Sequence, residues 1–88
     1  MTERKVQIVN TLGIHARPAT LIAQTAQQYQ SDISIEKDGL VVNAKSVMGV
    51  MMLVAGKGSW ITIRAEGPDE REAVEAIVKL VEEGFGEA

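Results

Sequence analysis

The stretch WITIRAEGPDEREAVEAIVKLVEEGFG, residues 60–86, carries the clearest strand and the clearest helix of the chain. In its first seven residues apolar side chains alternate with polar ones, the two-residue period of a strand with one buried face. Asp69 and Glu72 then predict a capping box at the start of a helix, and Gly84 predicts its end. Between them the apolar residues recur at helical spacing, as Val74, Ile77, Val78 and Val81. This stretch therefore predicts a strand followed by a helix, each with one apolar face.

The residues before this stretch predict five more elements of the same kind. Residues 4–10 alternate as a strand, and residues 16–28 have the apolar spacing of a helix. Residues 32–43 predict a hairpin with a type I′ turn at Asp38-Gly39. Residues 45–58 predict a short helix of about two turns that Ser46 can cap.

This order of elements, βαββαβα, predicts an α+β fold in a single domain that spans residues 1–88. Four strands and three helices with one apolar face each fit an open-faced β-sandwich. In that arrangement a four-stranded antiparallel sheet carries all three helices on one face, and its other face meets water.

Composition excludes several classes of function. With 45% hydrophobic and 24% charged residues, the chain is typical of globular proteins. It has no cysteine and a single histidine, so neither a metal nor another cofactor is expected. Residues 1–65 have a net charge of +3 and residues 66–88 one of −6, and the scattered cations do not form a nucleic-acid surface. No signal peptide or membrane-inserting segment is predicted, and we expect a cytoplasmic protein.

The single histidine, His15, lies in GIHARPAT, residues 13–20, at the start of the first predicted helix. Helix N-termini favour anions, and Arg17 adds a planar guanidinium that suits phosphoryl oxygens. Pro18 is tolerated in a first helical turn, where its missing N–H has no partner anyway, and Gly13 permits a sharp turn. These residues suit an imidazole that accepts a phosphoryl group, although position alone favours a simple helix cap. An alternative from another class is a small α/β ligand-binding or interaction domain in which His15 only caps the helix.

The two motifs GIHARPAT and KSVMGVMMLVA, residues 13–20 and 45–55, closely resemble the HPr family. These are the histidine-containing phosphocarriers of the bacterial phosphoenolpyruvate-dependent sugar phosphotransferase system. The resemblance covers essentially the whole chain. It implies that enzyme I phosphorylates His15 at Nδ1, that Arg17 stabilises the phosphoryl group, and that sugar-specific A components receive it. Such a protein is a carrier and not an enzyme; a regulator of the nitrogen-related phosphotransferase branch is the alternative within the family.

The same resemblance implies a second phosphorylation site at Ser46. In relatives, an ATP-dependent HPr kinase/phosphorylase modifies this serine, and the product serves a catabolite-control transcription factor as corepressor. Without the resemblance, Ser46 is a helix cap beside Lys45.

Helical spacing predicts an exposed docking surface for partners around His15. From the first helix it takes Thr20, Leu21 and Gln24, and from the second Val47, Met48 and Met51. Val50 and Leu53 are expected in the core, and so is Met52. The chain is expected to act as a monomer. It departs from the family pattern at Val54, where relatives usually have a small residue, and at Gln24 and Gln27, where many have lysine.

Overall fold

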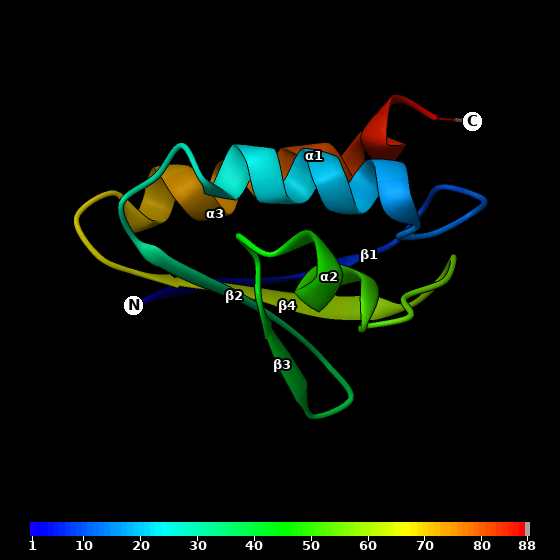
Figure 1. Ribbon diagram of the computed structural model, residues 1–88, viewed down its shortest axis with the longest axis horizontal. Coiled ribbons are helices and arrows are strands. Elements are labelled where there is room, and N and C mark those ends of the chain that lie inside the picture. Colours follow the sequence, from blue (N-terminus) through cyan, green and yellow to red (C-terminus); the bar gives the residue numbers. More distant parts are fainter. Residues whose placement is uncertain (88) are drawn as a thin grey trace.

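The computed structural model describes residues 1–87 and contains one four-stranded antiparallel sheet (Figure 1). The strand order is β1-β4-β2-β3. The strands are β1 Thr2–Gln7, β2 Asp32–Lys37, β3 Leu40–Asn43 and β4 Trp60–Glu66. β4 has the predicted bounds, whereas β1 begins and ends earlier than residues 4–10. Beyond β1, Ile8 still pairs with the residues just before β4. Its N–H donates to the carbonyl of Ser59, and its carbonyl accepts the N–H of Gly58.

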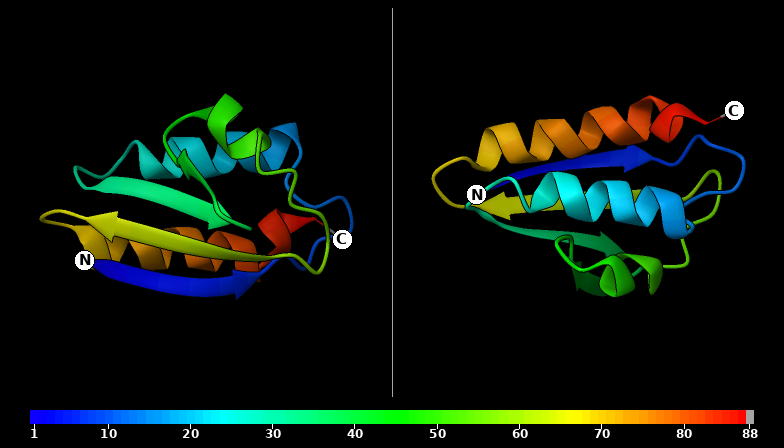
Figure 2. Two further views of the ribbon diagram at one scale, coloured as in Figure 1. Left: turned by 90° about the horizontal axis from the view of Figure 1, so that it is seen from below. Right: turned by 45° about the horizontal axis from the view of Figure 1, so that its top comes forward.

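Three α-helices accompany the sheet. They are α1 Ala16–Ala26, α2 Val47–Met51 and α3 Glu70–Glu82, and a single 3-10 turn, η1 Gly84–Gly86, follows α3. α1 and α3 lie side by side across one face of the sheet, with the short α2 next to α1 (Figures 1 and 2). The predicted α+β fold with an open-faced sheet is confirmed.

The core lies between the sheet and the helices. Ile61 and Ile63 of β4 pair with Val6 of β1 and Ile35 of β2, and all four side chains are buried. Burying an aliphatic side chain of this size contributes about 1.5–3 kcal/mol. The predicted helical stripes of α1 and α3 cover these residues, and Ala19, Ile22, Val74, Ile77 and Val81 are fully buried. Alternation in the strands and helical periodicity therefore produce one shared core.

The predicted hairpin turn is confirmed in its backbone geometry. Asp38 and Gly39 have φ values of 51° and 87°, and Lys37 pairs with Leu40 on the other side of the two-residue loop. Both central φ values are positive, as a type I′ turn requires. Gly84, with φ of 63°, ends α3 as predicted.

The predicted capping box of α3 is wrong. Asp69 is the N-cap residue, but its carboxylate makes no hydrogen bond within the helix. It accepts hydrogen bonds from the backbone N–H groups of Gln30 and Ser31 and from the Ser31 hydroxyl. The carboxylate of Asp69 therefore binds the turn between α1 and β2 instead of the first N–H groups of its own helix. It connects that turn to the turn before α3.

α2 is shorter than the predicted two turns and ends at Met51. The chain then bends through Val54, which has a φ of 48°. A β-branched residue rarely adopts this left-handed conformation, because its Cβ crowds the following carbonyl oxygen. Val54 is thus a strained residue, and it stands at a position where relatives usually have a small residue.

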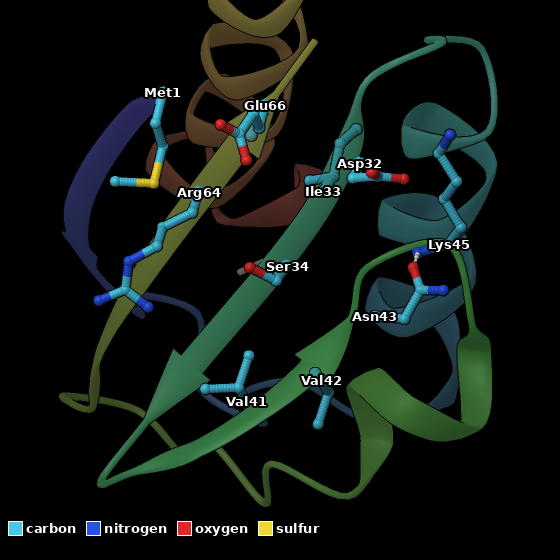
Figure 3. A pocket seen from close by; sticks show the side chains of 11 residues that line it. Met1, Asp32, Ile33, Ser34, Val41, Val42, Asn43, Lys45, Arg64 and Glu66 are labelled. Carbon is cyan, nitrogen blue, oxygen red and sulfur yellow. Dashed lines mark hydrogen bonds between the residues drawn. The ribbon is translucent and has the colours of Figure 1, made fainter.

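The open face of the sheet carries polar and charged side chains. Arg64 of β4 donates hydrogen bonds to Glu3 of β1 and Glu36 of β2. A groove of about 410 Å³ lies beside Arg64 and extends to Asn43 and Lys45 at the edge formed by β3 (Figure 3). None of the predicted site residues lines this groove. In residues 1–87, no helix is both long and apolar enough to cross a membrane.

Candidate functional site

His15 is the N-cap residue of α1, as the sequence predicts within one residue. Its backbone is extended, with φ of −101°, and its carbonyl accepts the N–H of Ala19 at 3.0 Å. The imidazole does not cap the helix, because it makes no hydrogen bond to the N–H groups of α1. The expectation that His15 serves only as a helix cap therefore finds no support in the side-chain geometry.

The loop before His15 is held against the segment that follows α2. The N–H of Ile14 donates to the carbonyl of Ala55 at 2.8 Å. Gly13 has a φ of 67°, and a Cβ atom on it would lie 2.4 Å from the Ala55 carbonyl oxygen. Only glycine fits this close approach, so Gly13 fixes the path of the loop and the position of His15.

The carboxylate of Glu87 lies directly against the imidazole. His15 Nε2 is 3.1 Å from Oε1 and 3.0 Å from Oε2 of Glu87. This hydrogen bond, more than any other contact, lowers the pKa of Glu87, so the group is an ionised carboxylate that can only accept. Nε2 must therefore carry the hydrogen. In a neutral ring the lone pair then resides on Nδ1, which leaves that atom as the nucleophile.

Two further donors meet the same carboxylate. Arg17 donates from one guanidinium nitrogen to Glu87 Oε2 at 3.1 Å and to the Phe85 carbonyl at 3.0 Å. Asn10 donates from Nδ2 to Glu87 Oε1 at 3.1 Å and to the Gly13 carbonyl at 2.8 Å. Glu87 is thus held by three side chains, and the last residues of the chain meet the start of α1 at one end of the molecule (Figure 2).

The other predicted residues of α1 differ in their surroundings. Pro18 is buried in the first turn, and Gln24 is exposed. The hydroxyl of Thr20 donates to the carbonyl of Ala16 in its own helix. Leu21 is half-buried and packs against the core. The expectation that the Leu21 side chain lies in water is wrong, since part of it is packed against the core.

Ser46 caps α2 as predicted. Its Oγ accepts the N–H of Gly49 at 3.0 Å, and the residue is half-exposed. Lys45 does not direct its ammonium to Ser46, because Nζ donates to the carbonyl of Tyr29 at 2.8 Å. The cation expected beside a phosphate at Ser46 is therefore engaged elsewhere.

The side chains of α2 divide between core and solvent. Val50 and Leu53 are buried as predicted, and Val47 is half-buried against the core. Met48 and Met51 are exposed as predicted. Met52 is exposed as well, and its expected place in the core is wrong. Because α2 has only five helical residues, helical spacing no longer sets the direction of a side chain beyond Met51.

The family model described as "PTS HPr component phosphorylation site" matches residues 2–83. The chain belongs to the HPr family. The HPr phosphocarrier protein of Cupriavidus necator is 45% identical over 99% of this chain and 98% of its own length. The HPr-like protein Crh of Halalkalibacterium halodurans is 50% identical over 93% of this chain and 98% of its own length.

Solved HPr structures agree with the fold. The crystal structure of HPr from Thermoanaerobacter tengcongensis has a TM-score of 0.95 and 49% identity, and the match covers 100% of this chain and 99% of that one. A crystal structure of an HPr dimer from that organism has a TM-score of 0.79, covering 99% of this chain and 100% of that one.

Sequence reasoning missed two residues of this HPr site, Asn10 and Glu87. Glu87 lies 72 residues after His15 and belongs to no periodic pattern, so no local signal placed it there. Asn10 is fully buried, and the only sign of a specific role was a polar residue at the end of the alternating stretch 4–10, on the same side as Val6 and Ile8.

Proposed function

We propose that this HPr-family chain is a phosphoryl carrier in which Nδ1 of His15 is the accepting atom. The observation that carries the proposal is the pair of contacts between Nε2 and the Glu87 carboxylate. They hold the hydrogen on Nε2, which leaves the Nδ1 lone pair available for attack on phosphorus. The donor is phosphorylated enzyme I, and the acceptors are sugar-specific A components.

In the accepting step, the Nδ1 lone pair attacks phosphorus, and the bond from phosphorus to enzyme I breaks. The displaced electron pair remains on enzyme I. Such a transfer depends mainly on positioning and on stabilising charge. The first N–H groups of α1, which begins directly after His15, and the Arg17 guanidinium, which shares the Glu87 carboxylate with His15, would stabilise the bound phosphoryl group. The second step returns the phosphoryl group to a partner, so the chain is unchanged after each cycle and acts as a carrier in the cytoplasm.

The proposal is tested by incubating the chain with phosphoenolpyruvate and enzyme I and measuring its intact mass. We expect one added phosphoryl group that acid removes and that His15→Ala abolishes. Gln28→Ala, at an exposed position just beyond α1 and outside the residues proposed for docking, serves as the matched variant because it should still accept the group. If the chain remains unmodified, the small interaction domain becomes the better interpretation. Transfer onward to sugar-specific A components distinguishes sugar uptake from the nitrogen-related branch.

We further propose that Ser46 is phosphorylated by an ATP-dependent HPr kinase/phosphorylase, in carbon catabolite control through a transcription factor. Two observations support this: the Ser46 hydroxyl is half-exposed, and the HPr-like protein Crh is among the relatives. With ATP and the kinase, we expect an acid-stable phosphate that Ser46→Ala abolishes. Ser34→Ala, which removes a half-exposed serine from the open face of the sheet, should leave it unchanged. Acid-stable phosphate on the Ser46→Ala chain would contradict the assignment.

Partners are proposed to dock on Thr20, Leu21, Gln24, Val47, Met48 and Met51, which we call the docking surface. Gln24, Met48 and Met51 are exposed in this surface, whereas Thr20, Leu21 and Val47 are half-buried. We propose that the chain presents this surface as a monomer. Because an HPr dimer is known from Thermoanaerobacter tengcongensis, sedimentation equilibrium at working concentration is the appropriate test.

A further inference from the structure

The three methionines of the α2 region, Met48, Met51 and Met52, are exposed within five residues of one another, and we call them the methionine cluster; α2 packs against α1, the helix that begins after His15. Their exposed fractions are 78%, 42% and 62%. Sulfur in an exposed methionine is open to peroxides, whereas a buried thioether is shielded. We propose that this methionine cluster is a site of reversible oxidation by peroxides, and that its oxidation weakens phosphotransfer. The second half of the inference rests on the proposed carrier function.

The chemistry needs only the thioether and a peroxide. A sulfur lone pair attacks one peroxide oxygen, the O–O bond breaks, and a sulfur–oxygen bond forms. With hydrogen peroxide, the other oxygen leaves as hydroxide and takes up the proton of the transferred OH, so water is the product. Sulfur loses two electrons and the peroxide gains them. The result is a polar, chiral sulfoxide, which methionine sulfoxide reductases reduce.

Oxidation of this cluster should leave the fold intact. The buried side chains of Val50 in α2 and Leu53 just after it fix this region to the core, and the hydrogen bond from Gly49 N–H to Ser46 Oγ caps α2. Met48 and Met52 direct most of their surface to solvent and contribute little to that anchoring. A sulfoxide oxygen there meets water and does not enter the core.

The same change matters for docking because the cluster is close to the carrier site. The carbonyl of Met51 accepts the N–H of Val54, and the next residue, Ala55, accepts the N–H of Ile14 beside His15. Methionine provides an apolar and adaptable contact surface, and a sulfoxide removes that property. If partners bury this surface, oxidation should lower kcat/KM for phosphotransfer from enzyme I about tenfold.

Met1 provides a control within the same chain. It is the only methionine outside the cluster and is 71% exposed. It lines the groove on the open face, close to Arg64 and away from α1 and α2 (Figure 3). Met1 should therefore oxidise at a similar rate without effect on phosphotransfer.

The test compares the chain with a Met48→Leu, Met51→Leu, Met52→Leu variant, in which leucine keeps the apolar volume. Both are treated with hydrogen peroxide under native conditions, oxidised residues are located by peptide mass, and phosphotransfer from enzyme I is measured before and after. We expect about a tenfold loss for the unaltered chain, reversal by methionine sulfoxide reductases A and B, and no loss for the variant relative to its own starting rate.

Three outcomes would overturn the inference alone. These are an unchanged rate with the cluster fully oxidised, an equal loss in the variant through Met1, and a loss of far-ultraviolet circular dichroism that shows unfolding instead of weakened docking. A chain that accepts no phosphoryl group even before treatment would overturn the carrier function, and this inference with it.

Discussion

At the scale of single residues, the Glu87 carboxylate determines how His15 is presented. It contacts Nε2 of His15 and also accepts hydrogen bonds from Arg17 and Asn10, so its charge lies against the ring on which the phosphoryl group is proposed to be carried. The carboxylate thus has two opposing effects. In the proposed carrier it orients the ring for attack by Nδ1, and its negative charge would repel the phosphoryl group after transfer.

Glu87→Gln should favour the phosphorylated form. The amide oxygen can still accept from His15, while the charge that repels the phosphoryl group is gone. We expect the equilibrium constant for phosphorylation by enzyme I to rise about fivefold at low salt, and less at high salt where charges are screened. The phosphorylated fraction at fixed enzyme I and phosphoenolpyruvate-to-pyruvate ratio measures it. Glu83→Gln, at an exposed position before η1, is the charge-matched control and should change little; an equal rise in that control would contradict a local role for Glu87.

At the scale of elements, local sequence patterns were sufficient where no distant partner competes. β4 has its predicted bounds, and Asp38-Gly39 forms the predicted turn. The capping box failed because Ser31, 38 residues away, offers Asp69 better hydrogen bonds than the helix does. The predicted α2 was too long, because the apolar residues continue in the sequence after the backbone leaves the helix at Met52.

Val54→Gly should stabilise the segment that follows α2. Val54 is 78% exposed, so little burial is lost, and glycine removes the cost of a positive φ at a β-branched residue. After allowing for the greater freedom of glycine in the unfolded chain, we expect a gain of about 1 kcal/mol in unfolding free energy. Urea denaturation measures it. Val41→Gly, at an exposed position within β3, should instead destabilise, and a loss of stability in Val54→Gly would contradict the assignment of strain.

At the scale of the whole molecule, the helices and the carrier site occupy one side and the open sheet face the other. The fold could be predicted because periodicity records which face of each element is buried. The surroundings of His15 could be predicted only in part, since Glu87 reaches His15 through tertiary structure alone. Contacts between β1 and α3 join the two layers: Glu70 accepts the Thr2 hydroxyl at 2.6 Å, and its carboxylate pairs with the N-terminal ammonium at 3.1 Å.

These contacts predict how stability depends on acid. The hydrogen bond from Thr2, followed by those from Gly67 N–H and the N-terminus, lowers the pKa of Glu70 from 4.5 to about 2. A lowered folded-state pKa contributes stability that is fully present above 4.5 and is lost as the pH falls towards 2. Glu70→Gln should therefore lower the unfolding temperature at pH 7 and make its fall over this acid range shallower. Thermal unfolding at a series of pH values measures both effects.

The control for this prediction is Glu72→Gln, an exposed position on the same helix whose side chain makes no hydrogen bond or ion pair within residues 1–87. It should behave like the unaltered chain. The same acid slope in the Glu70→Gln chain would refute the role of Glu70.

Nitrogen-15 and phosphorus-31 NMR of the labelled chain, phosphorylated by enzyme I and phosphoenolpyruvate, distinguishes the two ring nitrogens of His15. We expect coupling of phosphorus to Nδ1 while Nε2 retains its hydrogen. Phosphorus on Nε2, or no phosphohistidine at all, would show that Nδ1 of His15 is not the accepting atom.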